Sequence, residues 1–313
     1  MKGLELAKAY FEECGRPVFE EQFANLMPYL AFGLFGSGSE CFGFDDELSR
    51  DHDFEPGFMV LLPGEDVVSR RDAFLLERAY AKLPKSFKGF ERQPVSPVGG
   101  DRHGVLRYAD VFMNSTGTPD GCLTQAAWLT LPGYALAEAV NGEIFLDNYG
   151  EVTRIRKSLA GWPENVRFKK LAGHLLLMAQ AGQYNYPRCI ARGETGAAQL
   201  AAVKFAESAM EAAFLFADRY MPYYKWSFRA LKGLPVFEGL AEKLEYLIST
   251  GNDPDTAEEK TGLIETVASC FTDELQDRGW TKADCGDLEK HAYSVNDRIA
   301  DAQLRNRHIL AAV

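Results

Sequence analysis

Two aspartates separated by one residue follow a short glycine- and serine-rich stretch near the N-terminus. The stretch is GSGSECFG, residues 36–43, and the aspartates are Asp51 and Asp53. Side chains two residues apart in a strand point to the same face, so we expect both carboxylates to lie side by side, with His52 facing away. Carboxylates this close repel one another unless a cation lies beside them. The spacing predicts a magnesium site, because magnesium takes one or two carboxylates together with substrate phosphates.

The glycine- and serine-rich stretch offers a matching site for an anion. Gly36 and Gly38 allow close approach of the backbone, and consecutive amides can surround a phosphate. The hydroxyl of Ser37 or Ser39 can donate to a terminal phosphate oxygen. The apolar run LAFGLF, residues 30–35, predicts a buried strand before this turn. A strand, a Gly-Ser turn and a later Asp-x-Asp together favour phosphoryl or nucleotidyl transfer.

This order resembles the signature of the DNA polymerase β-type nucleotidyltransferase superfamily. GSECFG, residues 38–43, is similar to the GSRARG form of small bacterial members, which favours Gly38 and Ser39, while Gly36 and Ser37 also fit the spacing. The longer stretch GSGSECFGFDDELSRDHDFEPGF and the helical RYMPYYKWSFRAL resemble a family of uncharacterised bacterial proteins with a nucleotidyltransferase-like domain. The resemblance implies magnesium (Mg2+) and an NTP, ATP above the others, and it names no acceptor.

A third carboxylate would complete this pattern. Active members of the superfamily generally carry one on a later strand, as a metal ligand or as the base that activates the acceptor hydroxyl. In GVLRYADVF, residues 104–112, expected to be the third strand, Asp110 is the candidate, and it can equally cap a following helix. Glu55, in register with Asp51 and Asp53, is the alternative. Without either, we expect nucleotide binding without transfer.

Composition narrows the remaining possibilities. The formal net charge is −11, with 34 basic and 45 acidic residues and no basic stripe, so a nucleic-acid partner is not expected. Six cysteines occur without a CxxC pair, which argues against zinc and disulfides and favours a cytoplasmic protein. The N-terminus lacks the apolar core of a secretory signal, and no run is apolar enough to span a membrane.

The pattern of apolar residues predicts a small α/β unit followed by helices. The first part predicts helices at 2–14, 18–27 and 70–83, and strands at 30–35, near 50, at 58–62 and at 104–112. Later helices are expected at 165–181, 197–220, 237–250, 258–276 and 286–308. We therefore expect an α+β fold, with a mixed-sheet nucleotidyltransferase-like head at 1–120 and an all-helical domain at 121–313.

The helical domain adds two further expectations. Lys225, within an aromatic run, can reach the triphosphate if the domain faces the head, while Lys169 and Lys170 are expected on a solvated helix face. The leading hypothesis is a magnesium-dependent nucleotidyltransferase that moves a nucleoside monophosphate from an NTP to a hydroxyl of a small molecule or protein. The alternative is a degenerate nucleotide-binding sensor or partner-binding protein.

Overall fold

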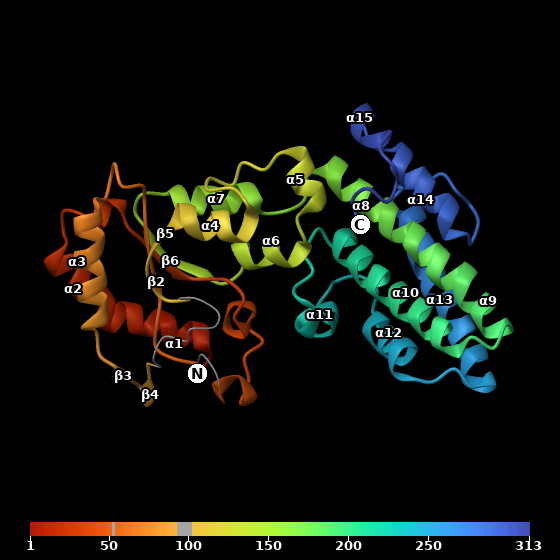
Figure 1. Cartoon of the computed structure of the whole chain (residues 1–313), viewed down its shortest axis with the longest axis horizontal. Helices are drawn as coiled ribbons and strands as arrows, with labels where there is room; N and C mark the ends of the chain where they lie inside the picture. Colours follow the sequence, from red (N-terminus) through yellow and green to blue (C-terminus); the bar gives the residue numbers. More distant parts are fainter. Residues whose placement is uncertain (52–53, 93–101) are drawn as a thin grey trace. The chain divides into compact units, whose positions relative to one another are not determined.

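The structure, a computed structural model, describes residues 1–51, 54–92 and 102–313 (Figure 1). It confirms the α+β class, since these residues form a four-stranded mixed sheet, a two-stranded hairpin and many helices. The chain divides into two compact units. The first contains residues 1–123 and 132–160, and the second contains residues 124–131 and 161–313. The first unit thus continues past the expected boundary at residue 120.

The first unit contains all six strands found in the described residues. Its elements are α1 (Gly3–Tyr10), η1 (Phe11–Gly15), α2 (Arg16–Gln22), η2 (Met27–Tyr29), β1 (Ala31–Leu34), η3 (Ser39–Phe42), η4 (Leu48–Asp51), β2 (Met59–Leu62), α3 (Arg70–Ala81), β3 (Ser86–Phe87), β4 (Phe90–Glu91), β5 (Gly104–Arg107), α4 (Tyr108–Thr116), α6 (Gly133–Val140), β6 (Glu143–Asp147) and α7 (Glu151–Leu159). Here η1 is a π-helical turn, and η2 to η4 are 3-10 turns.

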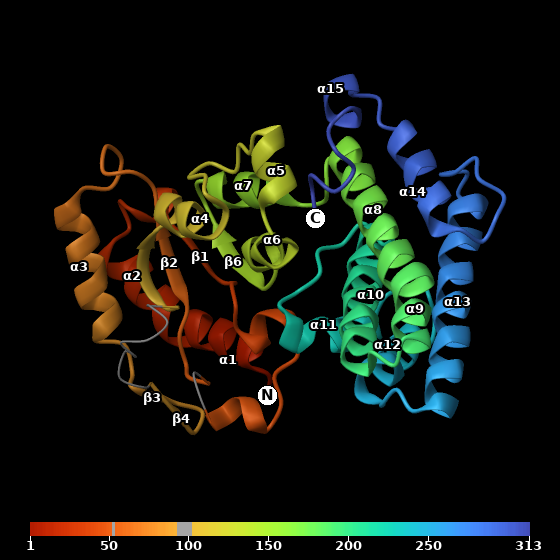
Figure 2. The ribbon, with the colours of Figure 1, turned by 45° about the vertical axis from the view of Figure 1, so that its right-hand side comes forward.

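The main sheet has the strand order β5-β2-β1-β6 (Figure 2). Strand β1 is antiparallel to β2 and β6, whereas β2 and β5 are parallel. The expectation that residues 121–313 are all helical is wrong at β6. This strand pairs Ile144 with Gly33, a partner more than a hundred residues earlier, so local sequence gives no sign of the pairing.

An aromatic core fills the space between the first helices and one face of the sheet. The rings of Phe11 and Phe32 lie 4.8 Å apart, and Phe58 is buried beside both. The helix expected to end at Gly15 instead continues through the π-helical turn η1 into α2. A Cβ at Gly15 would lie 2.4 Å from the Phe58 ring, so glycine serves close packing there rather than helix termination.

The other face of the sheet is covered by α4, α6 and α7. Helix α4 follows β5 directly and packs against α6, while α7 packs against α6 and β6. The ring of Phe35, just after β1, stacks on Phe112 of α4 at 5.8 Å with an interplanar angle of 17°. This contact fixes the end of β1 beside the start of α4.

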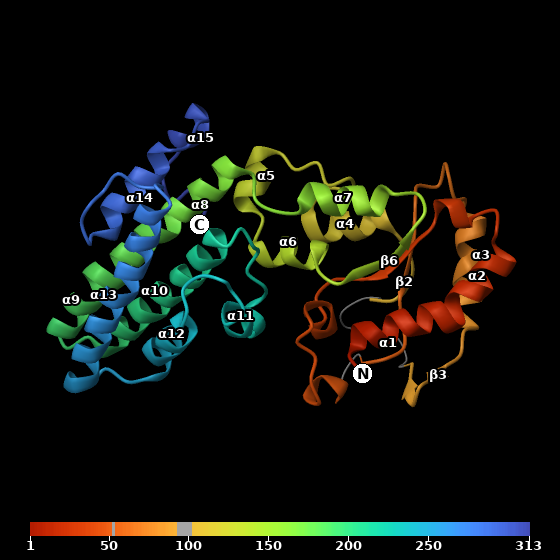
Figure 3. The same cartoon turned by 180° about the vertical axis from the view of Figure 1, so that it is seen from behind.

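The second unit is helical throughout its described elements. These are α5 (Gln125–Thr130), α8 (Glu164–Met178), η5 (Ala179–Asn185), α9 (Tyr186–Ala191), α10 (Thr195–Phe216), α11 (Tyr224–Leu231), α12 (Leu240–Ser249), α13 (Pro254–Asp277), α14 (Leu288–Asp297) and α15 (Ala302–Arg305). Helix α10 packs against α8 and α9, and α13 packs against α9 and α14 (Figure 3). Every helix in the described part of the chain is too short or too polar to cross a membrane.

Lys169 and Lys170 are buried, so their expected place on a solvated face is wrong. The Lys169 ammonium donates to the Asn296 side chain at 2.8 Å and to the Arg307 carbonyl at 2.7 Å. Lys170 donates to the carbonyls of Leu129 and Ala312 at 2.9 and 3.1 Å. Backbone carbonyls accept hydrogen bonds from the two buried ammonium groups and so stabilise their charge. Two adjacent lysines in the sequence give no sign of these partners.

Glu211 lies on α10, which packs against α8, and its carboxyl group has a shifted pKa. Burial raises the pKa of this carboxyl to about 7 from its ordinary value of 4.5, and the Lys170 ammonium opposes the rise only in part. The folded protein therefore holds this proton more tightly than the unfolded chain does. The stability contributed by protonated Glu211 is present at pH 4.5 and is lost as the pH rises towards 7.

Replacement of Glu211 by glutamine is expected to remove this pH dependence. The neutral amide resembles the protonated carboxyl, so Glu211→Gln should match the wild type at pH 4.5. At pH 8 it should be more stable by about 2 kcal/mol, after allowance for partial exposure of the side chain. Urea unfolding at both pH values measures the difference, with Glu258→Gln, an exposed residue on α13, as the control. An equal pH dependence in the wild type and Glu211→Gln would contradict this account.

Candidate functional site

A pocket of 720 Å³ opens beside the glycine-serine turn of the first unit. Its apolar lining comes from the end of β1, from β2 and β5, and from α4 and α6. Its polar lining includes Gly36, Ser37, Arg102, Arg107, Asp110 and Asn114. The structure thus brings three of the expected site residues, Gly36, Ser37 and Asp110, to one cavity.

The turn after β1 has a conformation that requires glycine. Gly36 has φ +124°, a region that other residues rarely adopt. Its N–H donates to the side-chain oxygen of Asn141 at 2.9 Å, and its carbonyl accepts from the Asn141 amide at 2.8 Å. Among the described residues, the backbone amides of Ser37, Gly38 and Ser39 have no acceptor. Of these three residues only Ser37 lines the pocket, so its N–H is the one available to an anion there.

The two Gly-Ser pairs differ in access to this pocket. Gly36 and Ser37 line it, whereas Gly38 lies under an ion pair between Arg102 and Glu40. A Cβ at Gly38 would fall 1.7 Å from the Arg102 guanidinium. The pair favoured by sequence resemblance, Gly38 and Ser39, is thus covered, and the alternative pair faces the cavity.

Two arginines give the pocket a cationic side. Arg107 ends β5, and its guanidinium donates to the Pro63 carbonyl. Arg102 precedes the same strand and pairs with Glu40. Neither arginine was among the residues expected at the site. The position of Arg107 on an expected strand was a usable signal, but nothing in the sequence pairs Arg102 with a residue 62 positions earlier.

Asp110 lies on a helix rather than on the expected strand. Strand β5 ends at Arg107, and α4 begins at once, with Asp110 in its first turn. An acidic residue there is stabilised by the positive end of the helix. The exposed carboxylate lines the pocket and has no hydrogen-bond or ion-pair partner in the described part of the chain.

Glu55, the alternative third carboxylate, already has a partner. Its Oε1 lies 3.0 Å from Nδ1 of His103, and both side chains are mostly buried. It is not part of the pocket lining that includes Gly36 and Ser37. Of the two candidates, the geometry therefore favours Asp110.

The prediction that a strand begins near Arg50 is wrong. Residues Leu48–Asp51 form η4, and β2 begins only at Met59. The Asp46 carboxylate explains the turn, because it accepts from the backbone N–H groups of Leu48 and Ser49, both at 3.1 Å. Asp53 and His52 lie outside the described residues, as does the side chain of Asp51, so the shared face of the two aspartates stays a prediction.

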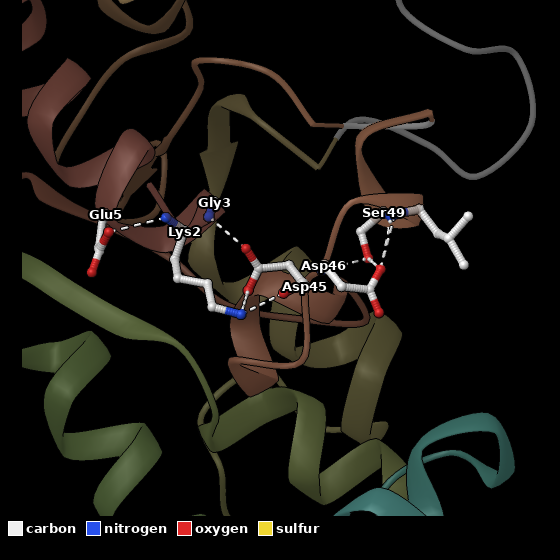
Figure 4. A network of polar contacts seen from close by, with 7 residues as sticks. Lys2, Gly3, Glu5, Asp45, Asp46 and Ser49 are labelled. Atoms are coloured by element: carbon white, nitrogen blue, oxygen red, sulfur yellow. Dashed lines mark hydrogen bonds and ion pairs between the residues drawn. The ribbon is translucent and has the colours of Figure 1, made fainter.

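The segment that leads to these aspartates is attached to the N-terminus (Figure 4). The buried Asp45 carboxylate accepts from the Gly3 amide at 2.9 Å and lies 3.5 Å from the Lys2 ammonium. Gly3 is the first residue of α1, where a carboxylate stabilises the exposed amides of the helix. This contact holds the start of the Asp45–Ser49 segment in a fixed position.

Lys225 belongs to the second unit. It lies on α11, and its ammonium is 5.2 Å from the centre of the Trp226 ring. An exposed cation over an aromatic face is a common local contact. Its expected contact with a triphosphate stays a prediction.

Residues 128–227 match the model of a family described as "Domain of unknown function (DUF4037)". The matched segment is about a third of the chain and contains α6, β6 and α7 of the first unit, together with α8 to α10 of the second. It includes Asn141 but not the glycine-serine turn. A comparison with curated proteins gave no match.

Proposed function

We propose that the first unit binds a nucleoside triphosphate and transfers its nucleoside monophosphate to an acceptor hydroxyl. One observation carries the proposal: Gly36 and Ser37 of the Gly-Ser turn share a pocket with two arginines and with the Asp110 carboxylate, which has no partner in the described residues. Amides and guanidinium groups bind phosphate oxygens, while a carboxylate close to them can accept a proton. A volume of 720 Å³ is within the usual range for small-ligand sites.

Each residue has a definite part in this reaction. The amide and hydroxyl of Ser37 and the Arg107 guanidinium hold the phosphates. Asp110 accepts the proton of the acceptor hydroxyl, whose oxygen attacks the α-phosphorus. The bond from that phosphorus to the bridging oxygen breaks, and pyrophosphate leaves with the electron pair. The acceptor keeps the nucleoside monophosphate, so atoms and charge balance.

The carboxylate oxygens at the pocket are the type of ligand that magnesium prefers. Asp110 supplies a free carboxylate, but the described residues contain no group of three His, Cys, Asp or Glu side chains that could hold a metal ion. The proposed site therefore needs Asp51 and Asp53 as ligands. When bound, magnesium would supply the positive charge that offsets the triphosphate and stabilises the transition state.

A second candidate function is nucleotide binding without transfer. The position of Asp110 on a helix, rather than on a strand beside the other two aspartates, favours it. A protein of this kind would bind an NTP through the same turn and arginines and release no pyrophosphate. The two functions share the binding site and differ only in turnover.

Calorimetric titration of ATP, GTP, CTP and UTP, with and without magnesium, tests the shared site. The wild type is expected to bind at least one nucleotide more tightly with magnesium. Asp51→Ala/Asp53→Ala should weaken that binding at least about tenfold, because the ligands for the phosphate-bound cation are removed.

The matched control removes two negative charges elsewhere. Glu12→Ala/Glu20→Ala changes exposed residues whose ion pairs, within the described part of the chain, are with Arg16 on the same helical run, so its affinity should stay within about twofold of the wild type. Equal affinities for the wild type and Asp51→Ala/Asp53→Ala would overturn the metal role. No binding by the folded wild type would overturn the proposed function.

A further inference from the structure

Asn141 joins two distant segments at the edge of the pocket. It follows the last residue of α6 and precedes β6, and its side chain makes both hydrogen bonds of the Gly36 backbone. Paired bonds to the N–H and carbonyl of one residue define the orientation of that peptide segment. Gly36 has little other restraint, since a Cβ placed there would meet nothing within 4 Å.

Arg156, on α7, forms hydrogen bonds to the corner made by residues 139–142, which contains Asn141. Its guanidinium donates to the carbonyls of Ala139, Val140 and Asn141 at 3.4, 2.9 and 2.6 Å. It also lies over the Phe35 ring, 4.8 Å from its centre. Burial lowers the pKa of Arg156 to about 10, so the group stays charged at neutral pH. One side chain thus touches both the corner and the residue before Gly36.

A third contact ties the far end of the turn to the same corner. The Gly142 amide donates to the Cys41 carbonyl at 2.9 Å. Gly142 has φ +61°, and a Cβ there would lie 2.1 Å from the Leu34 carbonyl oxygen. The corner of residues 139–142 therefore contacts the glycine-serine stretch both before Ser37, at Gly36, and after it, at Cys41.

We infer that Asn141 is a positioning residue that orients the Gly36 turn for phosphate binding. The inference rests on the proposed function and assigns a role to a residue that does not line the pocket. By engaging the Gly36 backbone, Asn141 sets the direction of the chain into Ser37, which lines the pocket and whose amide has no acceptor in the described residues. A turn fixed before binding loses less conformational entropy when the ligand arrives, and it therefore binds more tightly.

Three variants test this role. Asn141→Ala removes both bonds to Gly36. Asn141→Asp retains an acceptor for the Gly36 amide, loses the donor and adds a negative charge. Asn148→Ala is the control, because Asn148 follows the same strand and its side chain donates a single bond of 2.8 Å to the Met27 carbonyl. Titration with inorganic triphosphate and with magnesium ATP gives the affinities, and thermal unfolding shows that each variant is folded.

The expected result separates positioning from stability. Asn141→Ala should weaken both ligands about tenfold, the size expected for the loss of two hydrogen bonds that organise a site. Asn141→Asp should lose more affinity at low salt than at high salt, because its added charge repels the anion and is screened by ions. Asn148→Ala should bind within twofold of the wild type even if its unfolding temperature falls.

Two outcomes overturn the inference in different ways. If the wild type binds either ligand and folded Asn141→Ala binds it within twofold, Asn141 has no positioning role and the proposed function stands. If the folded wild type binds neither ligand, the proposed function fails, and the role of Asn141 fails with it.

Discussion

Asp110→Asn is expected to slow magnesium-dependent pyrophosphate release at least about 100-fold while changing NTP affinity less than about threefold. Asparagine keeps the size of the side chain but cannot accept the proton of an acceptor hydroxyl. Asp110 is exposed at the pocket and its carboxylate has no partner in the described residues, so little binding energy depends on it. Continuous measurement of pyrophosphate, with hydroxyl-bearing acceptors and bulk water, gives the rate.

The control is the same aspartate-to-asparagine substitution in the first turn of another helix. Asp72 lies in the first turn of α3, as Asp110 does in α4, but outside the pocket. Asp72→Asn should leave the rate within about twofold. If Asp110→Asn released pyrophosphate at the wild-type rate and Glu55→Gln released none, Glu55 would be the third carboxylate. Tight NTP binding by a wild type that never releases pyrophosphate would favour the sensor.

Lys260→Met is expected to destabilise the second unit by about 1–3 kcal/mol, because a buried set of neutral oxygen acceptors loses its donor. Lys260 is fully buried in α13. Its ammonium donates to Gln199 Oε1 and the Thr250 carbonyl at 2.9 Å, and to the Gly251 carbonyl and Asn252 Oδ1 at 3.0 Å. Methionine fills similar space and leaves four oxygen acceptors without this donor. Urea unfolding followed by circular dichroism measures the loss.

Lys290→Met is the matched control for this stability effect. Lys290 is exposed on α14, so the same substitution should change the free energy of unfolding by less than about 0.5 kcal/mol. Unfolding of Lys260→Met at the wild-type urea concentration would show that water or neighbouring donors satisfy the four oxygens. The expected difference between the two lysines tests burial alone, because the chemistry of the change is identical.

Sequence pattern predicted the parts of the fold whose signal is local. The run 30–35 contains β1, and the helix expected at 70–83 is α3. In each case apolar spacing and flanking turn residues agree with the burial that the structure shows. The turn after β1 was predicted for the same reason, since glycine and serine are turn residues in any context.

The remaining features depend on contacts between distant residues. Strand β6 exists because it pairs with β1, and Arg102 reaches the turn because Glu40 holds it. Lys169 and Lys170 are buried because carbonyls far along the chain surround them. Asp110 lines the same pocket as Gly36 and Ser37, but β5 ends at Arg107, so this carboxylate lies on a helix rather than on the expected strand. None of these partners lies within a window of sequence that periodicity can interpret.

Strand β6 lies far after β1 in the sequence, and this affects folding while the chain is being synthesised. During synthesis, β1 emerges with only β2 to pair with, and its other edge stays open until residue 147 has left the ribosome. An open strand edge can recruit other chains, and a long wait for its partner lengthens that exposure. A recombinant fragment ending at residue 120 would retain the open edge permanently and would also lack Asn141. Fragments meant to fold alone should therefore extend through α7 at Leu159.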